Sequence, residues 1–268
     1  MNLPPDVDTS AAHAYESFLV PGVMAPWAET IVSQMHISRG MHVLDVACGT
    51  GIAARHAARR VGTSGRIVGV DIDQGMLAVA RTVSIKEGAD IEYVYASACE
   101  LPFESEAFDA ALCLQGLQYL PDPLKAISEV RRVLRNDSVL VSVTWSEIEN
   151  CKGHWAIVSA LERRNIDAAA VRKPFARANG AELHSLALEA GFKDVSIRTA
   201  QQLGRFPSAA SFVDAMLRGA TSSRYALEKL PRNEWPNFLA EVNDELAQWS
   251  SPAGIEFPME SNVLTARG

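Results

Sequence analysis

The sequence predicts a doubly wound α/β fold, and two strand ends carry this prediction. The apolar run 43–46 indicates a short buried strand. Gly49-Thr50-Gly51 then form a tight turn, and the Ala- and Arg-rich segment 52–60 has high helix propensity. A second buried strand over 65–70 ends at Asp71, about twenty residues past the turn. A strand, a glycine turn and a helix in this order are typical of the nucleotide-binding corner of such folds.

The glycine turn and Asp71 predict how a ligand would be held. Glycine lets a ligand lie against bare backbone, and the helix that follows presents free N–H groups and the positive end of its dipole. A carboxylate such as Asp71 can accept hydrogen bonds from two neighbouring ribose hydroxyls. The alternative is that Asp71 only caps the next helix, a task that Asp73 could share.

The rest of the chain continues the alternation of strands and helices, which favours a parallel sheet with right-handed crossovers. Strands are expected near 43–46, 67–71, 91–95, 109–114, 138–144, 195–199 and 262–266, seven in all. Helices are expected near 51–60, 74–87, 123–135, 156–166 and 180–190. The segment 123–135 places its apolar residues on one face, as a helix packed on a sheet does.

Helices are also expected at two places outside this alternation. Residues 1–10 suggest a loose tail, and 11–35 suggest two short helices broken at Pro21-Gly22. The segment 207–250 is largely helical and predicts a cap packed on the edge of the sheet. Its apolar stripe has helical period and is expected to be core: Trp235, Phe238, Leu239, Val242, Leu246 and Trp249.

Composition limits the class of protein. The 268 residues are 48% hydrophobic and 21% charged, as in an ordinary soluble globular domain, and we treat 1–268 as one domain. The net charge of −7 argues against a nucleic-acid substrate. Four isolated cysteines suggest neither a disulfide framework nor a zinc or other metal site. The polar, acidic start and the absence of a long apolar run predict a cytoplasmic protein.

The charge beside the glycine turn distinguishes between two nucleotides. Gly49-x-Gly51-x-x-Ala54 also fits the dinucleotide pattern of NAD(P) enzymes. Asp45, however, precedes the turn and would repel a pyrophosphate. It would attract a ligand that carries an ammonium and a sulfonium group, as S-adenosylmethionine does.

Five ordered motifs resemble those of the class I S-adenosylmethionine-dependent methyltransferases. The stretch 43–51 resembles the V-L-D-V-A-C-G-T-G form of the first motif of this family. The later motifs are Gly69–Leu77, Leu101–Asp109, Arg132–Arg135 and Ala190–Val195. Together they cover roughly residues 40–200, and the subgroup resembled is the small-molecule type related to ubiquinone-biosynthesis methyltransferases.

This resemblance implies a Rossmann-like sheet of six parallel strands and one antiparallel strand. It implies lid helices over 11–36, a cofactor-binding core over 40–200 and a helical cap over 205–255. S-adenosylmethionine is the implied cofactor and S-adenosylhomocysteine the product. The implied cofactor-binding residues are Asp45, Ala47, Gly49, Gly51, Asp71, Ile72, Met76, Ser97, Ala98 and Gln115. Ser97 stands where the family usually has an aspartate that accepts from the adenine amino group.

The expected chemistry is an in-line displacement of the methyl group onto an O, N or C atom of a small-molecule acceptor. A general base is needed only for an acceptor of high pKa, and the candidates are His154 and Tyr15. The competing interpretations are an NAD(P)-dependent oxidoreductase and a non-catalytic S-adenosylmethionine-binding protein. No nucleic acid and no membrane span are expected, and the chain is a monomer or a homodimer.

Overall fold

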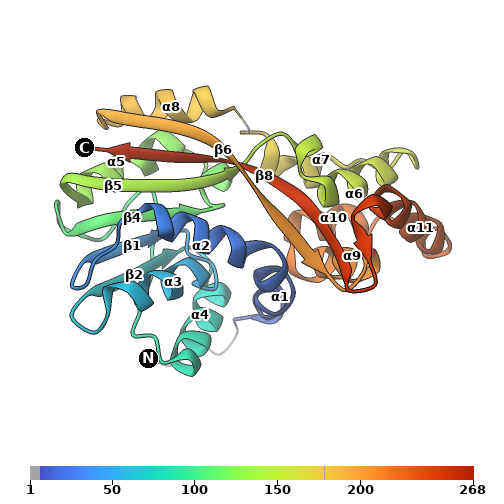
Figure 1. The fold of residues 1–268 in the computed structure, drawn as a ribbon, viewed down its shortest axis with the longest axis horizontal. Helices are drawn as coiled ribbons and strands as arrows, with labels where there is room; N and C mark the ends of the chain where they lie inside the picture. The colour runs from blue at the N-terminus through green and yellow to red at the C-terminus, as the bar shows by residue number, and fades with distance from the viewer. Residues whose placement is uncertain (1–6, 178) are drawn as a thin grey trace.

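A computed structural model describes residues 7–177 and 179–268 of the chain, and its centre is one mixed sheet (Figure 1). In the described part the sheet has eight strands, in the order β3-β2-β1-β4-β5-β8-β6, with β7 paired to β8. The strands are β1 His42–Val46, β2 Arg66–Asp71, β3 Glu92–Tyr95, β4 Phe108–Leu114, β5 Leu134–Trp145, β6 Asp194–Phe206, β7 Ser250–Ser251 and β8 Gly254–Arg267. The pairs from β3 to β5 are parallel and β8 is antiparallel to both neighbours, so the predicted α/β class is confirmed.

The last strands differ from the prediction in number and length. The two-residue strand β7 makes eight strands instead of seven, and it pairs with the start of β8. Strands β6 and β8 are longer than predicted and continue past the other strands as a twisted two-stranded ribbon (Figure 1). Ile255, Phe257 and Met259 are buried with partly exposed neighbours between them, which is the period of two of a half-buried strand.

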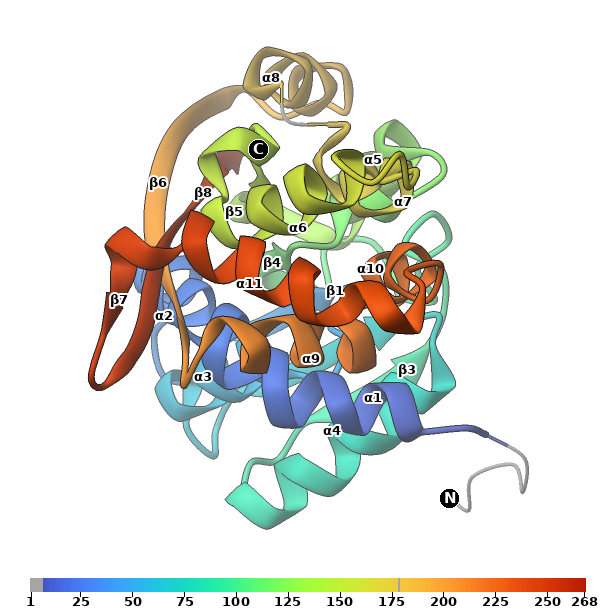
Figure 2. The same cartoon turned by 90° about the vertical axis from the view of Figure 1, so that its right-hand side faces the viewer.

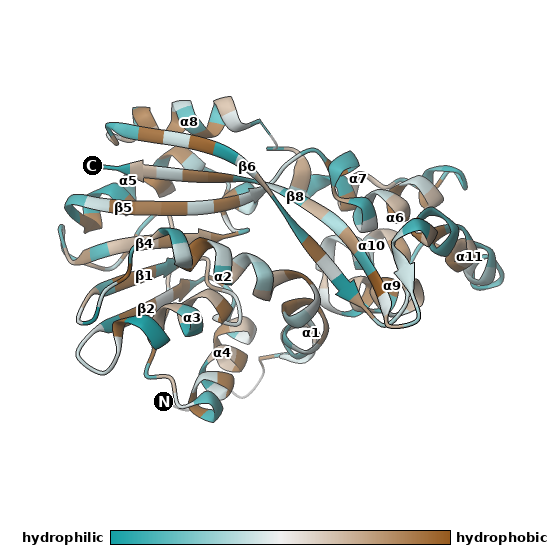
Figure 3. Ribbon diagram, viewed as in Figure 1, coloured by the Kyte–Doolittle hydropathy of each residue, from teal (hydrophilic) through white to brown (hydrophobic). Residues whose placement is uncertain are grey.

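Helices cover both faces of the sheet. The first face packs on α2 Ala25–Gln34 and α3 Ile52–Val61, and the other on α5 Pro123–Val133 and α8 Gly180–Glu189. Adjacent strand residues supply opposite faces: Val43 belongs to the first cluster and Leu44 to the second. The central strands are accordingly apolar along much of their length (Figure 3). Helix α4 is Gln74–Glu87, and the short turns are η2 Leu117–Tyr119, η3 Ile148–Asn150, η4 Lys173–Phe175, η5 Arg232–Glu234 and η6 Ala247–Trp249.

The N-terminal region forms one continuous helix, so the predicted break at Pro21-Gly22 is wrong. α1 Ser10–Ala14 runs into the π-helical segment η1 Tyr15–Met24 and then into α2. Proline has no N–H to donate, and the wider π-helical turns accommodate its ring without ending the helix. Gly22 lets the helix approach β6, because a Cβ there would lie 2.7 Å from Cζ of Phe206. Residues 1–6 of the predicted tail lie outside the described part, and the helix already begins at Ser10.

The remaining helices lie beyond the carboxyl ends of the parallel strands rather than along an edge strand (Figures 1 and 2). They are α6 Lys152–Glu162, α7 Ala169–Arg172, α9 Ala209–Gly219, α10 Thr221–Leu227 and α11 Trp235–Glu245. α9 packs against η1, α10 against α7, and α11 against α6. Half of the predicted stripe is core, since Phe238, Val242 and Leu246 are fully buried, and the other half, Trp235, Leu239 and Trp249, is partly buried and packs against that core. None of the described helices is long and apolar enough to cross a membrane.

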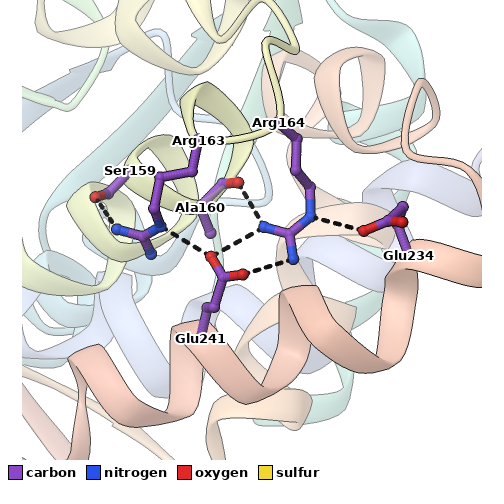
Figure 4. A network of polar contacts seen from close by, with 6 residues as sticks. All are labelled: Ser159, Ala160, Arg163, Arg164, Glu234 and Glu241. Carbon is purple, nitrogen blue, oxygen red and sulfur yellow. Dashed lines mark hydrogen bonds and ion pairs between the residues drawn. The ribbon is translucent and has the colours of Figure 1, made fainter.

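A charged network joins α6 to α11 (Figure 4). The Glu241 carboxylate accepts from Nε of Arg163 at 2.8 Å and from Nη2 of Arg164 at 2.7 Å. The Arg164 side chain also donates to the carbonyl of Ala160, and its Nε lies 3.4 Å from Glu234. Hydrogen bonds from the two arginines lower the pKa of Glu241 to about 2. The network therefore anchors α11 to α6 through one carboxylate.

Replacing Glu241 by glutamine is expected to lower the unfolding free energy by about 1 kcal/mol at neutral pH, because the pair is partly solvated. A carboxyl whose pKa falls on folding stabilises above its unfolded pKa, here near 4.5, and loses this effect as the pH falls toward 2. Urea unfolding should give unfolding free energies for wild type and Glu241→Gln that become equal as the pH falls toward 2. Glu245→Gln, at the end of the same helix, is the control. A difference in unfolding free energy between wild type and Glu241→Gln that persists at low pH would show that Glu241 acts through packing instead.

Candidate functional site

The ends of β1 and β4 hold two strained residues side by side. Ala47 and Gln115 have φ values of 54° and 55°, which non-glycine residues seldom adopt. They follow adjacent parallel strands. A Cβ on Gly116 would lie 2.7 Å from Cβ of Ala47, so the two strand ends are closely packed. Backbone strain of this kind gathers at ligand sites, and these ends face the crevice where open α/β sheets bind ligands.

The two glycines of the turn serve different purposes. Gly49 and Gly51 both have positive φ, at 54° and 82°. A Cβ on Gly51 would overlap the hydroxyl of Tyr93, so this position is fixed by packing. A Cβ on Gly49 would meet nothing within 4 Å. Gly49 therefore faces open space, as expected where a ligand approaches the backbone.

Asp45 is a buried carboxyl beneath this turn. Its side chain is 1% exposed, and its Oδ2 accepts from the N–H of Ala54 in the first turn of α3 at 2.9 Å. Burial is the main cause that raises the pKa of Asp45 to about 8; the charge of Asp71 adds to the rise, while the hydrogen bond from Ala54 and the charge of Arg55 oppose it. Asp45 is thus largely protonated at neutral pH.

Asp71 organises the same turn from the neighbouring strand. Its Oδ2 accepts from the N–H of Gly49 at 2.8 Å, and its Oδ1 accepts from the N–H of Asp73 at 2.9 Å. The side chain of Asp73 caps α4 by accepting from the N–H of Met76, so the interpretation of Asp71 as this cap is wrong. The Asp71 carboxylate, which also accepts from the backbone of Ile72, still has acceptor capacity for a ligand. Burial raises the pKa of Asp71 despite these hydrogen bonds.

The N-terminal helix lies over this acidic corner. A Cβ on Gly75 would lie 2.8 Å from the carbonyl oxygen of Asp8. The pKa of Tyr15 is raised mainly by burial, with contributions from the charges of Asp71 and Asp45. Tyr15 thus lies near the two carboxylates. Ile72, beside Asp71, is 64% exposed, an apolar surface at the mouth of the corner.

A polar chain connects β4 to β8. Gln115 Nε2 donates to Oγ of Ser261 at 3.0 Å, and Gln118 Nε2 donates to Oε1 of Gln115 at 2.9 Å. Oε1 of Gln118 is buried without a hydrogen-bond partner. The chain fixes the side chain of Gln115 at the strand end. Sequence reasoning missed Ser261 because it lies 146 positions from Gln115 and follows no motif.

The predicted adenine-side residues follow β3. Ser97 is exposed, and its Oγ accepts from the N–H of Cys99 at 3.1 Å, so it acts as an acceptor in the local turn. Ala98 is 5% exposed. Met76, half-buried, lies in the first turn of α4. The three residues thus lie on loops or helix ends that follow β2 and β3.

His154 is buried in an aromatic cluster. Its ring centroid lies 5.2 Å from that of Phe175, 5.6 Å from that of Trp145 and 5.9 Å from that of Phe212. Its Nδ1 is buried without a partner, and burial lowers its pKa to about 4. His154 is therefore neutral at pH 7. Among the described residues, no hydrogen bond or ring contact joins it to Tyr15, so the two candidate bases occupy separate surroundings.

A surface pocket of about 660 Å³ borders this cluster. Phe175 lines it and at the same time stacks on Trp145. The other lining residues come from the segment after β5, from α7 and η4, and from Tyr225 of α10. Phe175 therefore separates the pocket from His154.

The strand order, the glycine turn and the acidic strand ends define a Rossmann-like fold with a nucleotide-type corner. Residues 44–142 match the family described as a methyltransferase domain. The chain is 34% identical over 123 residues to demethylmenaquinone methyltransferase of Staphylococcus aureus, covering 45% of this chain and 50% of that protein. The chain thus spans about half the length of the curated relatives it matches. These matches confirm the predicted resemblance to class I methyltransferases related to quinone biosynthesis.

Solved structures show the same fold over more of the chain. Phosphoethanolamine N-methyltransferase 2 of Haemonchus contortus, in complex with S-adenosyl-L-methionine, has a TM-score of 0.60 at 20% identity and matches 97% of this chain and 57% of that one. A SAM-dependent methyltransferase from Aquifex aeolicus has a TM-score of 0.54 at 20% identity and matches 74% of this chain and 92% of that one. At these identities the likeness establishes the fold.

Proposed function

We propose that this protein is an S-adenosylmethionine-dependent methyltransferase that acts on an O, N or C atom of a small molecule. One observation carries the proposal. Two carboxyl groups, Asp45 and Asp71, flank a glycine turn whose first glycine faces open space. A ligand with an ammonium and a sulfonium group complements these carboxyl groups, whereas the pyrophosphate of NAD(P) would lie beside Asp45. The matched domain and relatives support the same class.

The residues at the corner fit this cofactor. Asp71 keeps acceptor positions for ribose hydroxyls, and exposed Ile72 offers an apolar face to a base. Gln115, Asp45 and the open side of Gly49 would hold the methionine part, and Ser97 and Ala98 the adenine. When bound, S-adenosylmethionine supplies a methyl group already activated by the sulfonium. We further propose that the helices of 11–36 form a lid, and those of 205–255 a cap, around the core of 40–200.

Cofactor binding is expected to release a proton. Burial raises the pKa of Asp45 to about 8, so the group is mostly protonated at pH 7, and a bound cation favours its ionised form. Affinity should therefore rise with pH up to about 8 and then level off. Calorimetry at pH 7 in phosphate and in Tris, whose ionisation enthalpies differ, reports the number of protons released. Asp45→Asn is the control and should abolish the release. Equal heats in the two buffers would contradict this role.

The acceptor side is proposed to lie at the carboxyl ends of β4 and β5, where His154 lies in its aromatic cluster. A neutral imidazole can take a proton from an acceptor, and its unpartnered Nδ1 leaves a hydrogen-bond position free. The related enzyme is named for demethylmenaquinone, which makes hydroxylated aromatic rings the first acceptors to try. Apolar aromatic walls suit a flat ring.

The activity is tested by release of S-adenosylhomocysteine from S-adenosylmethionine with a panel of quinols, phenols and small amines. If His154 is the base, His154→Phe is expected to reduce kcat about a hundredfold with cofactor affinity unchanged. The aromatic replacement maintains packing in the cluster. An unchanged kcat/KM for the best acceptor would exclude His154 and leave Tyr15 as the candidate. No turnover with any acceptor, together with tight cofactor binding, would favour a non-catalytic binding protein.

The setting of the enzyme is also a proposal. Four free cysteines suit a reducing cytoplasm, and the net charge of −7 disfavours nucleic acid as the acceptor. A monomer or homodimer is expected, and sedimentation of the purified chain would distinguish them.

A further inference from the structure

Arg55 lies inside α3, next to the proposed cofactor corner, and is buried like a core residue. It is 1% exposed, although the sequence around it suggests a solvated Ala- and Arg-rich helix. A buried guanidinium is costly unless charge partners and hydrogen-bond acceptors surround it. An apolar side chain would fill the same space without that cost. The contacts of Arg55 therefore call for an explanation beyond packing.

The guanidinium joins three segments that are distant in the sequence. Its Nη1 donates to the carbonyl of Thr50, inside the glycine turn. Its Nη2 donates to Oε1 of Glu16 at 2.7 Å, on the N-terminal helix. Its Nε lies 3.2 Å from Oε1 of Glu87, at the end of α4. The planar guanidinium spreads its donors over three nitrogen atoms and can reach these three acceptors, whereas the three donors of a lysine all lie on one nitrogen.

The contact with Glu16 lies where the N-terminal helix covers the acidic corner. Glu16 is adjacent to Tyr15, which lies near Asp45 and Asp71. It belongs to the π-helical segment η1, whose wide turns are intrinsically less stable than α-helix. Oε2 of Glu16 is buried without a hydrogen-bond partner, so the polar contacts of this side chain in the described part are made through Oε1 to Arg55. Movement of this segment away from the corner would break the ion pair.

We propose that Arg55 is a positioning residue that couples the glycine turn to the helix over it, so that the Arg55–Glu16 pair sets how long the cofactor stays bound. The cofactor part rests on the proposed function. In this proposal the cofactor lies under Tyr15 and leaves when η1 moves, and η1 is tied through Arg55 to the glycine turn. The helix η1 therefore closes over the acidic corner in the same step in which the glycine turn becomes ordered.

Two matched variants separate coupling from simple stability. Glu16→Gln and Glu87→Gln each remove one carboxylate partner of Arg55, but only the first releases the covering helix. Glu87 also pairs with the exposed Arg59 at 3.0 Å, so Glu87→Gln removes two ion pairs and serves as the control for a general loss of stability. Release of S-adenosylhomocysteine, measured by stopped-flow displacement, is expected to be roughly tenfold faster in Glu16→Gln and within about twofold of wild type in Glu87→Gln. Arg55→Lys should behave like Glu16→Gln, and the double variant should be no faster than either.

Hydrogen exchange of the ligand-free protein gives a second readout that needs no cofactor. Exchange over residues 10–24 should accelerate in Glu16→Gln and stay unchanged in Glu87→Gln. Equal effects of the two variants on exchange would overturn the coupling. Equal rates of S-adenosylhomocysteine release from the two variants would overturn the role of the Arg55–Glu16 pair in holding the cofactor. A wild type that binds no S-adenosylhomocysteine would refute the proposed function, and the exchange comparison would still decide the role of Arg55.

Discussion

Replacing Gly51 by alanine is expected to lower the free energy of unfolding by roughly 2–5 kcal/mol. Two effects add. An alanine at a φ of 82° costs roughly 1–2 kcal/mol, and its Cβ would overlap the hydroxyl of Tyr93. Relief of that overlap must disturb a buried tyrosine that is hydrogen-bonded to Ser84 at 2.9 Å, which costs another 1–3 kcal/mol, by the general scale of overpacking. The sum is a large part of the stability of an ordinary domain. Circular dichroism melts and urea unfolding measure it.

Gly49→Ala is the matched control, two residues away. Gly49 also has a positive φ, but a Cβ at this position would have no atom within 4 Å. The variant should fold with a loss of about 1 kcal/mol and should bind S-adenosylmethionine at least about tenfold more weakly, because the methyl fills the open side of the turn. Tyr93→Phe combined with Gly51→Ala should recover part of the lost stability. If Gly51→Ala and Gly49→Ala unfold at the same temperature, the packing account of Gly51 is wrong.

Replacing Asp71 by asparagine is expected to weaken S-adenosylmethionine binding by tenfold or more. Asp71 accepts from Gly49 and from Asp73 through its two oxygens, and an amide can accept through only one. The variant loses either the hydrogen bond that orders the turn or the acceptor for a ribose hydroxyl. A hydrogen bond to a charged group contributes roughly 1.5–3 kcal/mol, which corresponds to at least a tenfold change in Kd. Titration calorimetry measures the Kd directly.

Asp73→Asn provides the control for Asp71. Asparagine remains a good N-cap, so α4 and the cofactor Kd should both change little. The two variants have the same change in charge and lie two positions apart. Equal losses of affinity in both would show that net negative charge, and no specific hydrogen bond of Asp71, is what the ligand needs.

The elements that the sequence predicted well are those set by neighbours in the chain. The strand before the glycine turn and the helix after it follow from a local pattern, and both occur as predicted. The cap of α4 shows the limit of this reasoning, because Asp71 and Asp73 both fit a cap and only geometry chose Asp73. Pro21 was expected to break a helix, yet the wider turns of η1 carry the helix through it.

Contacts between distant segments could not be predicted from the same patterns. Ser261 supports Gln115 only because β8 returns to the middle of the sheet. Arg55 resembles its exposed neighbours Arg59 and Arg60 in the sequence, and its burial follows from how the N-terminal helix folds back over α3. Apolar residues alternate with other residues around Phe257 in the sequence, and this period of two would have predicted the long strand β8. The roles of the individual site residues toward a ligand remain predictions.

The most direct test is calorimetric titration of the wild-type protein with S-adenosylmethionine, S-adenosylhomocysteine and NAD under the same conditions. The charge and shape of the corner between Asp45, Asp71 and Gly49 predict micromolar binding of the first two and no measurable binding of NAD. Binding of NAD in preference to S-adenosylmethionine would contradict the central proposal, because a pyrophosphate would then lie beside the carboxyl group of Asp45.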